Sequence, residues 1–244
     1  METAQYTPVF ELVPAFDNGY EGRARNAFMA DCLRGVIEYN VPPPGDHEAL
    51  FSRDHQLMFN EEIAAEWGYP GSRLPRQEAP GVDPEKVTPE IETEIERCGN
   101  EIPAEFRAPA PNILNDLTGA GWGEISANPA VEEATAAWHE CMLPLGLVDL
   151  PDGPDEMPPT SVRGLSNEEF GYADQELELT EKERSIAIAD ARCRTESNYD
   201  EAFFRARAEG ELVAIGKNIE EFEASRTAYE EYEKQIDAVL AELG

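Results

Sequence analysis

The spacing of apolar residues along the chain predicts helices. Between residues 23 and 39, Phe28 and Leu33 are part of a pattern with about one apolar position per helical turn. The run PPPG that begins at Pro42 ends this helix, because proline cannot continue the hydrogen-bond ladder. A second helix is predicted from about residue 46 to residue 67. The fold class is therefore expected to be mostly α.

Three further helices are marked by residues that favour helix starts. Thr88 and Asn128 each precede a proline, so the side chain caps the helix and proline occupies its first position. Thr180 and Glu183 form a capping box before the run RSIAIADARC. Five prolines between residues 144 and 159 begin a long, irregular, proline-rich connection that is expected to reach residue 176.

The C-terminal region carries the clearest helical pattern. Its apolar residues follow a three-and-four repeat, which is typical of a helix that packs along one face, at Leu212, Ile215, Ile219, Phe222, Tyr229, Ile236, Leu240 and Leu243. This seam predicts a long helix from about residue 200 to residue 242. We expect the seam to be scaffold, either by packing within the chain as a helical hairpin or by forming a dimer.

One phrase of sequence occurs twice. FMADCL near the N-terminus and WHECML in the middle both place an aromatic residue shortly before a cysteine. Each phrase has a later counterpart, IETEIERCGNE or IAIADARCRTE, in which arginine directly precedes a cysteine. Each half of the chain therefore reads as a helix with one cysteine, a proline-rich excursion, and a capped helix with a second cysteine.

The doubled phrase favours one pairing of the four cysteines, Cys32 with Cys98 and Cys141 with Cys193. Four cysteines allow three pairings, and four reduced, buried cysteines are the alternative interpretation. Disulfides would place the protein outside the cytoplasm. The first residues do not resemble a signal peptide, so a secreted form would have lost its leader.

The repeat also predicts the domain organisation. An irregular N-terminal arm is expected over residues 1–22, where no helical period is visible. A first disulfide-linked helical unit is predicted over residues 23–127, and a second, which includes the long C-terminal helix, over residues 128–244. Apolar residues make up 41% of the 244 positions, which is enough for a sizeable core.

The composition is strongly acidic, and this limits the classes of partner. The chain has 51 Asp and Glu against 19 Lys and Arg, a formal net charge of −32. A negative field repels phosphates and anionic lipids, so no nucleic-acid partner is expected, and a basic partner is favoured. Solubility or adaptation to salt also explains this charge. Since no apolar run is long enough to span a bilayer, we expect no membrane insertion.

The sequence contains none of the common catalytic motifs. GxSxG, GxGxxG, the P-loop and HExxH are absent, and no two cysteines have the close spacing typical of zinc sites. We therefore expect no catalytic residue, no metal and no cofactor. Aromatic residues are the candidates for binding, with core packing as the competing interpretation, at Trp67, Tyr69, Trp122 and Trp138.

Four segments carry a family resemblance: FMADCL at 28–33, IERCGNE at 95–101, WHECM at 138–142, and LTEKERSIAIADARCR at 179–194. Together they resemble a family of secreted or lipid-anchored actinobacterial proteins of uncharacterised function, in which Trp-x-x-Cys-Met and Ala-Asp-x-x-Cys phrases recur. The resemblance implies an envelope-side, disulfide-bonded helical protein that accompanies exporters or associates with the cell wall. It implies no catalytic residue.

The function predicted from the sequence is therefore that of a non-enzymatic, extracytoplasmic binding or scaffold protein of the cell envelope, with a protein or cell-wall partner. Two other classes stay open. A carboxylate-dependent cell-wall or polysaccharide hydrolase would need a cleft with two carboxylates about 5–10 Å apart, one of them with a raised pKa. An acidic inhibitor of a basic partner would carry carboxylates along one face.

Overall fold

The computed structural model of the chain is mostly helical, which confirms the expected fold class. The structure describes residues 7–16, 19–41, 59–70, 79–110, 112–125, 127–163 and 178–243. The chain divides into two compact units, which are described separately. Unit 1 consists of Met1–Thr7, Ala49–Arg76 and Ala120–Leu212, and unit 2 consists of Pro8–Glu48, Gln77–Gly119 and Val213–Gly244.

The helices of the described ranges, in chain order, are α1 (Pro8–Leu12), α2 (Gly19–Cys32), α3 (Glu61–Trp67), α4 (Pro89–Asn100), α5 (Asn112–Ile125), α6 (Pro129–Met142), α7 (Thr160–Arg163), α9 (Glu181–Glu196), α10 (Tyr199–Lys217) and α11 (Ile219–Leu243). Two short strands, β1 (Tyr39–Asn40) and β2 (Gly81–Val82), pair antiparallel. Short 3₁₀ helices follow or precede several of these elements, among them Pro14–Phe16 and Pro154–Glu156.

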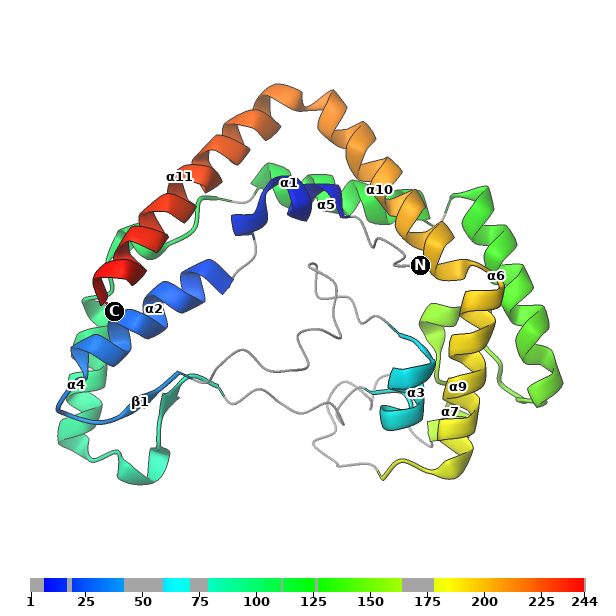
Figure 1. Cartoon of the computed structure of the whole chain (residues 1–244), viewed down its shortest axis with the longest axis horizontal. Coiled ribbons are helices and arrows are strands. Elements are labelled where there is room, and N and C mark those ends of the chain that lie inside the picture. The colour runs from blue at the N-terminus through cyan, green and yellow to red at the C-terminus, as the bar shows by residue number, and fades with distance from the viewer. Residues whose placement is uncertain are drawn as a thin grey trace. The chain divides into compact units, whose positions relative to one another are not determined.

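Unit 1 is organised around α9, drawn in yellow in Figure 1, which packs against α3, α6 and α7. The core between these helices contains Trp138 and Met142 of α6, both fully buried, and Ile186, Ala187 and Ala191 of α9. Ala187 and Ala191 lie on one face of α9 because positions four apart in a helix point the same way, and Ile186 flanks them. This face holds the helix that carries Cys193 against the helix that carries Cys141.

In unit 2, α11 packs along α2 (red and blue in Figure 1). Phe222, Tyr229 and Ile236 of α11 are spaced seven residues apart and are almost fully buried. The Tyr232 hydroxyl donates a hydrogen bond of 2.8 Å to the main-chain oxygen of Phe106, which satisfies a polar group inside this core. This part of the predicted seam therefore forms scaffold within the chain.

The predicted long C-terminal helix is interrupted. Asn218 separates α10 from α11, and Asn198, with a φ of +56°, separates α9 from α10. Asparagine tolerates this left-handed conformation better than most residues, so it can end one helix and begin the next. Two seam residues, Leu212 and Ile219, are about half exposed at 47% and 48%, so packing within the chain covers the seam only in part. A dimer through this region stays a prediction.

The predicted helix starts are confirmed. Thr88, Asn128 and Thr180 accept hydrogen bonds from main-chain N–H groups in the first turns of α4, α6 and α9. Glu183 has a role that its capping motif did not indicate. It is buried, and its Oε1 accepts a bond of 3.2 Å from the main-chain N–H of Tyr69. This carboxylate therefore ties α9 to the segment that follows α3.

Three predicted boundaries differ from the structure. The arm over residues 1–22 contains α1 and a 3₁₀ helix, because burial of Val9 and Val13 stabilises segments too short to show a period. The helix predicted to residue 39 ends at Cys32 and is followed by a turn with Gly35 at φ +85°. The division near residue 127 does not coincide with the two units, since both are discontinuous in sequence. Of the second predicted helix, residues 46–58 lie outside the described ranges.

Within unit 1, α5 and α10 cross at two glycines. A Cβ on Gly210 would lie 3.0 Å from the Gly121 Cα, and a Cβ on Gly121 would lie 2.9 Å from the Arg207 main-chain oxygen. These distances are shorter than side chains tolerate, so the backbones approach closely because both residues are glycine. The crossing also places Trp122 beneath the Arg207 guanidinium, whose carbon is 4.7 Å from the indole centroid.

Gly121→Ala is expected to lower the free energy of unfolding by about 1–3 kcal/mol, because the new methyl group overpacks the crossing. Gly123 is the matched control, since it lies on the same helix and no atom of the described residues outside that helix's own backbone lies within 4 Å of its Cβ position. Gly123→Ala is expected to raise stability by about 0.5–1 kcal/mol through helix propensity. Denaturant unfolding followed by tryptophan fluorescence measures both, and equal effects of the two variants would contradict the close approach.

Candidate functional site

All four cysteines are paired as the doubled phrase predicted. Cys32 is bonded to Cys98 with a Cα–Cα distance of 6.0 Å, and Cys141 to Cys193 with a distance of 5.7 Å. The first bond joins α2 to α4 in unit 2, and the second joins α6 to α9 in unit 1. The alternative of four reduced cysteines is therefore wrong.

A buried polar cluster lies beside the Cys141–Cys193 disulfide. The indole Nε1 of Trp138 donates a hydrogen bond of 2.8 Å to Oδ1 of Asp190, and both side chains are fully buried. Arg194 Nε donates to the same carboxylate oxygen at 3.0 Å, and the guanidinium also donates to the main-chain oxygen of Pro154. Each buried polar atom of this cluster thereby gains a partner, as interiors require.

Aromatic rings surround this cluster. The guanidinium carbon of Arg194 lies 5.1 Å from the centroid of Phe59 and 5.9 Å from that of Tyr199. The Phe59 ring stacks on Tyr69 with 5.5 Å between centroids. Burial raises the pKa of the Tyr69 phenol, and the charge of Asp190 raises it further. Because these rings enclose the cluster, we assign Trp138, Asp190 and Arg194 a structural role in the core of unit 1.

The equivalent positions in unit 2 have a different chemistry. When the two halves are aligned on their cysteines, Met29 takes the place of Trp138 and Ile95 takes the place of Asp190. Both residues belong to an apolar cluster around Cys98. The repeated architecture thus uses a hydrogen-bonded indole and carboxylate in one unit and apolar contacts in the other.

The four aromatic residues predicted for binding do not form one site. Trp138 and Tyr69 are buried in the core of unit 1, so their predicted binding role is wrong, because the packing of α3, α6 and α9 covers them. Trp67 is half-buried at the end of α3. Trp122 is 43% exposed, so of these four it is the one most open to a ligand.

Trp122 lines a groove of about 860 Å³ in unit 1. The aromatic part of the lining is continuous, since the Phe203 centroid lies 5.7 Å from that of Trp122 and 5.9 Å from that of Tyr199. The polar part comes from α6 and from the segment after it. The groove is lined by Trp122, Ile125, Val131, Glu132, Thr135, Ala136, His139, Glu140, Asp152, Asp155, Tyr199 and Phe203.

The groove has a strongly negative lining. It contains four carboxylates, from Glu132, Glu140, Asp152 and Asp155, and its lining residues include neither lysine nor arginine. Tyr199 is buried beneath the groove, and this burial together with the charge of Asp155 raises the pKa of its phenol to about 12. The phenol therefore stays neutral, and the negative charge of the groove comes from the exposed acids.

Two other hollows of the described residues are less suited to recognition. One in unit 1, of about 760 Å³, has acids and alanines but no aromatic residue in its lining, and Arg205 supplies an opposing charge. One in unit 2, of about 680 Å³, has Tyr39 and Met29 but also Arg25. The groove at Trp122 is therefore the candidate binding site, since it combines aromatic rings with a single sign of charge.

Sequence reasoning missed most of this groove. Tyr199 and Phe203 lie one helical turn apart in α10, which is a detectable signal, but the pattern alone does not show that Trp122 packs against them. Asp152 and Asp155 belong to the acidic turn around the 3₁₀ helix Pro154–Glu156, which the sequence marks only as a surface turn.

The described ranges hold neither of two other kinds of site. None of the helices there has both the length and the apolar character required to cross a bilayer. The same residues include no group of three or more His, Cys, Asp or Glu side chains arranged to hold a metal ion.

Comparisons of the chain with protein-family models, with curated proteins and with solved structures find no match. The resemblance to secreted or lipid-anchored actinobacterial proteins therefore stays a prediction based on short motifs.

Proposed function

We propose that the chain is a non-catalytic binding protein of an oxidising compartment, and that its groove at Trp122 takes a basic segment of a partner protein. The observation that carries the proposal is the combination of exposed carboxylates and aromatic rings in that groove. Guanidinium and ammonium groups are attracted both by carboxylates and by the faces of aromatic rings. Two disulfides are compatible with a location outside the reducing cytoplasm.

Rigid support for the groove favours the same function. Trp122 is positioned by the glycine crossing of α5 and α10, and its ring is held between Arg207 and Phe203. On the inner side, Tyr199 packs against the buried Arg194. A binding surface that is already ordered loses less conformational entropy when it takes up a ligand. The hydrolase and inhibitor alternatives stay predictions.

The proposal predicts that charge in the groove, and not only total charge, determines affinity for basic peptides. The probe is a fluorescently labelled peptide of alternating arginine and glycine, measured by anisotropy in about 0.15 M salt, where charges beyond about 8 Å are screened. Asp152→Asn combined with Asp155→Asn is expected to weaken binding about five- to tenfold, since each exposed ion pair contributes up to about 1 kcal/mol.

The control is a second double variant with the same net charge. Glu133 and Glu209 are exposed acids that line the other hollow of unit 1. Glu133→Gln combined with Glu209→Gln is expected to change affinity less than twofold. Equal losses in both double variants would show that the peptide responds to overall charge, and the proposed site would be rejected. A matched glutamate-glycine peptide is expected not to bind.

A further inference from the structure

The two disulfides are built at equivalent positions and have matched exposure. In each, the cysteine of the first helix is partly exposed, Cys32 in α2 and Cys141 in α6. In each, the cysteine of the second helix is buried, Cys98 with 0% and Cys193 with 4% of its surface exposed. A reagent in solution therefore reaches each bond through the cysteine of the first helix. We therefore expect differences in reactivity between the two bonds to come from their neighbouring side chains.

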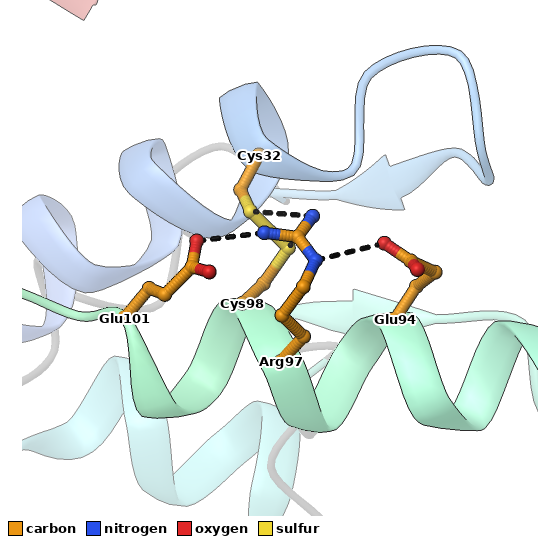
Figure 2. Close-up of a disulfide and its surroundings, with 5 residues drawn as sticks. All are labelled: Cys32, Glu94, Arg97, Cys98 and Glu101. Carbon is orange, nitrogen blue, oxygen red and sulfur yellow. Dashed lines mark hydrogen bonds and ion pairs between the residues drawn. A yellow bond between two sulfur atoms is a disulfide. The ribbon is translucent and has the colours of Figure 1, made fainter.

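The neighbour of the Cys32–Cys98 bond is a guanidinium, as Figure 2 shows. Arg97 Nη2 lies 3.6 Å from Cys32 Sγ and 3.5 Å from Cys98 Sγ. The other nitrogens of Arg97 are held by carboxylates, Nε by Glu94 at 3.0 Å and Nη1 by Glu101 at 2.7 Å. These two ion pairs, with Glu94 in α4 and Glu101 at its C-cap, orient the guanidinium so that its remaining nitrogen is directed at the sulfur atoms.

The neighbour of the Cys141–Cys193 bond is a carboxylate. Glu196, three residues after Cys193, places Oε2 3.7 Å from Cys141 Sγ. The arginine that corresponds to Arg97 is Arg192, and it pairs with Glu61 at 2.8 Å. The position directly before the second cysteine thus places a positive charge at the disulfide of unit 2. The position three residues after the second cysteine places a negative charge at the disulfide of unit 1.

We propose that the Cys32–Cys98 bond is a site of thiol–disulfide exchange with a dithiol reductant, whereas the Cys141–Cys193 bond is a structural link. A thiolate of the reductant attacks the partly exposed Cys32 Sγ and forms a mixed disulfide. The Cys32–Cys98 bond breaks, and its electron pair leaves on Cys98 Sγ as a thiolate that accepts a hydrogen bond from Arg97. The second thiol of the reductant, once deprotonated, attacks the reductant sulfur that is bonded to Cys32. This closes a disulfide within the reductant and releases Cys32 as a thiolate.

The neighbouring charges explain why exchange is expected to be faster at Cys32–Cys98 than at Cys141–Cys193. Exchange is faster when the leaving sulfur is stabilised as a thiolate, because a thiol with a lower pKa leaves more easily. Arg97 stabilises the negative charge on the sulfur that leaves. Glu196 repels the incoming thiolate at the sulfur that would be attacked in unit 1. The two electrons gained by the protein disulfide are those lost by the dithiol, which becomes a disulfide.

The test is the rate at which each bond opens in the intact, folded chain. The protein is treated with dithiothreitol, an uncharged dithiol, and samples are quenched in acid, alkylated and digested. Mass spectrometry then gives the alkylated fraction of Cys98 and of Cys193. We expect the Cys32–Cys98 bond to open on the order of tenfold faster, with the mixed disulfide on Cys32. Equal rates, or faster opening of Cys141–Cys193, would overturn the proposal.

Three variants separate the charge effect from a loss of structure. Arg97→Gln is expected to slow opening of Cys32–Cys98 several-fold, whereas simple loosening of α4 would accelerate it. Glu196→Gln is expected to accelerate opening of Cys141–Cys193. Arg192→Gln, the matched control, is expected to leave both rates unchanged. An unchanged or faster rate in Arg97→Gln would refute the assigned role of the guanidinium.

Discussion

Asp190→Ala is expected to lower the free energy of unfolding of unit 1 by about 3–5 kcal/mol, because it removes one partner from a buried ion pair. Asp190 is fully buried, and the side chain of Arg194 is only 14% exposed. Without the carboxylate, the guanidinium loses its counter-charge and the Trp138 indole loses its acceptor. Both groups then have too little contact with water to replace the lost bonds.

The location of the tryptophans allows the stability of unit 1 to be measured separately. The chain has three, at residues 67, 122 and 138, and all three fall in the segments that form unit 1. Tryptophan fluorescence therefore follows unfolding of unit 1, and circular dichroism follows the whole chain. In a denaturant titration, Asp190→Ala is expected to move the fluorescence transition to lower denaturant concentration. A shift equivalent to less than about 1 kcal/mol would contradict the structural role assigned to the pair.

Two further variants identify the cause of the destabilisation in Asp190→Ala. Asp190→Asn keeps an acceptor for Trp138 but removes the charge, so its effect is expected to lie between those of the natural chain and Asp190→Ala. Adding Arg194→Met to Asp190→Ala removes the uncompensated guanidinium and is expected to recover part of the loss. This non-additivity measures the coupling of the two residues directly.

Replacing both Cys141 and Cys193 with alanine is expected to destabilise unit 1 by about 4 kcal/mol. The bond closes a loop of 52 residues, and its loss restores conformational freedom to the unfolded chain. The chain-entropy model gives nearly the same value for the Cys32–Cys98 bond, whose separation is 66 residues. Denaturant unfolding without reductant, followed by tryptophan fluorescence, measures the effect of replacing Cys141 and Cys193.

The matched control is the double replacement of Cys32 and Cys98 with alanine. It removes the other bond and is expected to change circular dichroism more than tryptophan fluorescence, because unit 2 has no tryptophan. If the fluorescence transition moved equally in both double variants, the assignment of one disulfide to each unit would be contradicted.

Local features of this fold could be predicted from the sequence because their causes are local. Thr88, Asn128 and Thr180 cap helices through bonds that span two or three residues. The cysteine pairing followed from the doubled phrase, since equivalent positions in two similar units have the same neighbours. These signals do not depend on how distant parts of the chain pack.

The features that were missed depend on distant contacts. Trp138 and Trp122 have similar sequence surroundings, yet one is buried against Asp190 and the other is exposed in the groove. A helical pattern identifies an apolar face, but it does not say which face another helix covers. The breaks at Asn198 and Asn218 are also hidden, because the apolar repeat continues across residue 218.

The order of the disulfides along the chain has a consequence for biosynthesis. The four cysteines are bonded in consecutive pairs, the first with the second and the third with the fourth, so both partners of the Cys32–Cys98 bond are synthesised before Cys141. In a chain that emerges N-terminus first into an oxidising environment, Cys32 can therefore pair with Cys98 before a wrong partner is present. Correct linkage then needs no isomerase to undo mispaired intermediates, although the core of unit 2 is completed only when α11, the last helix, arrives.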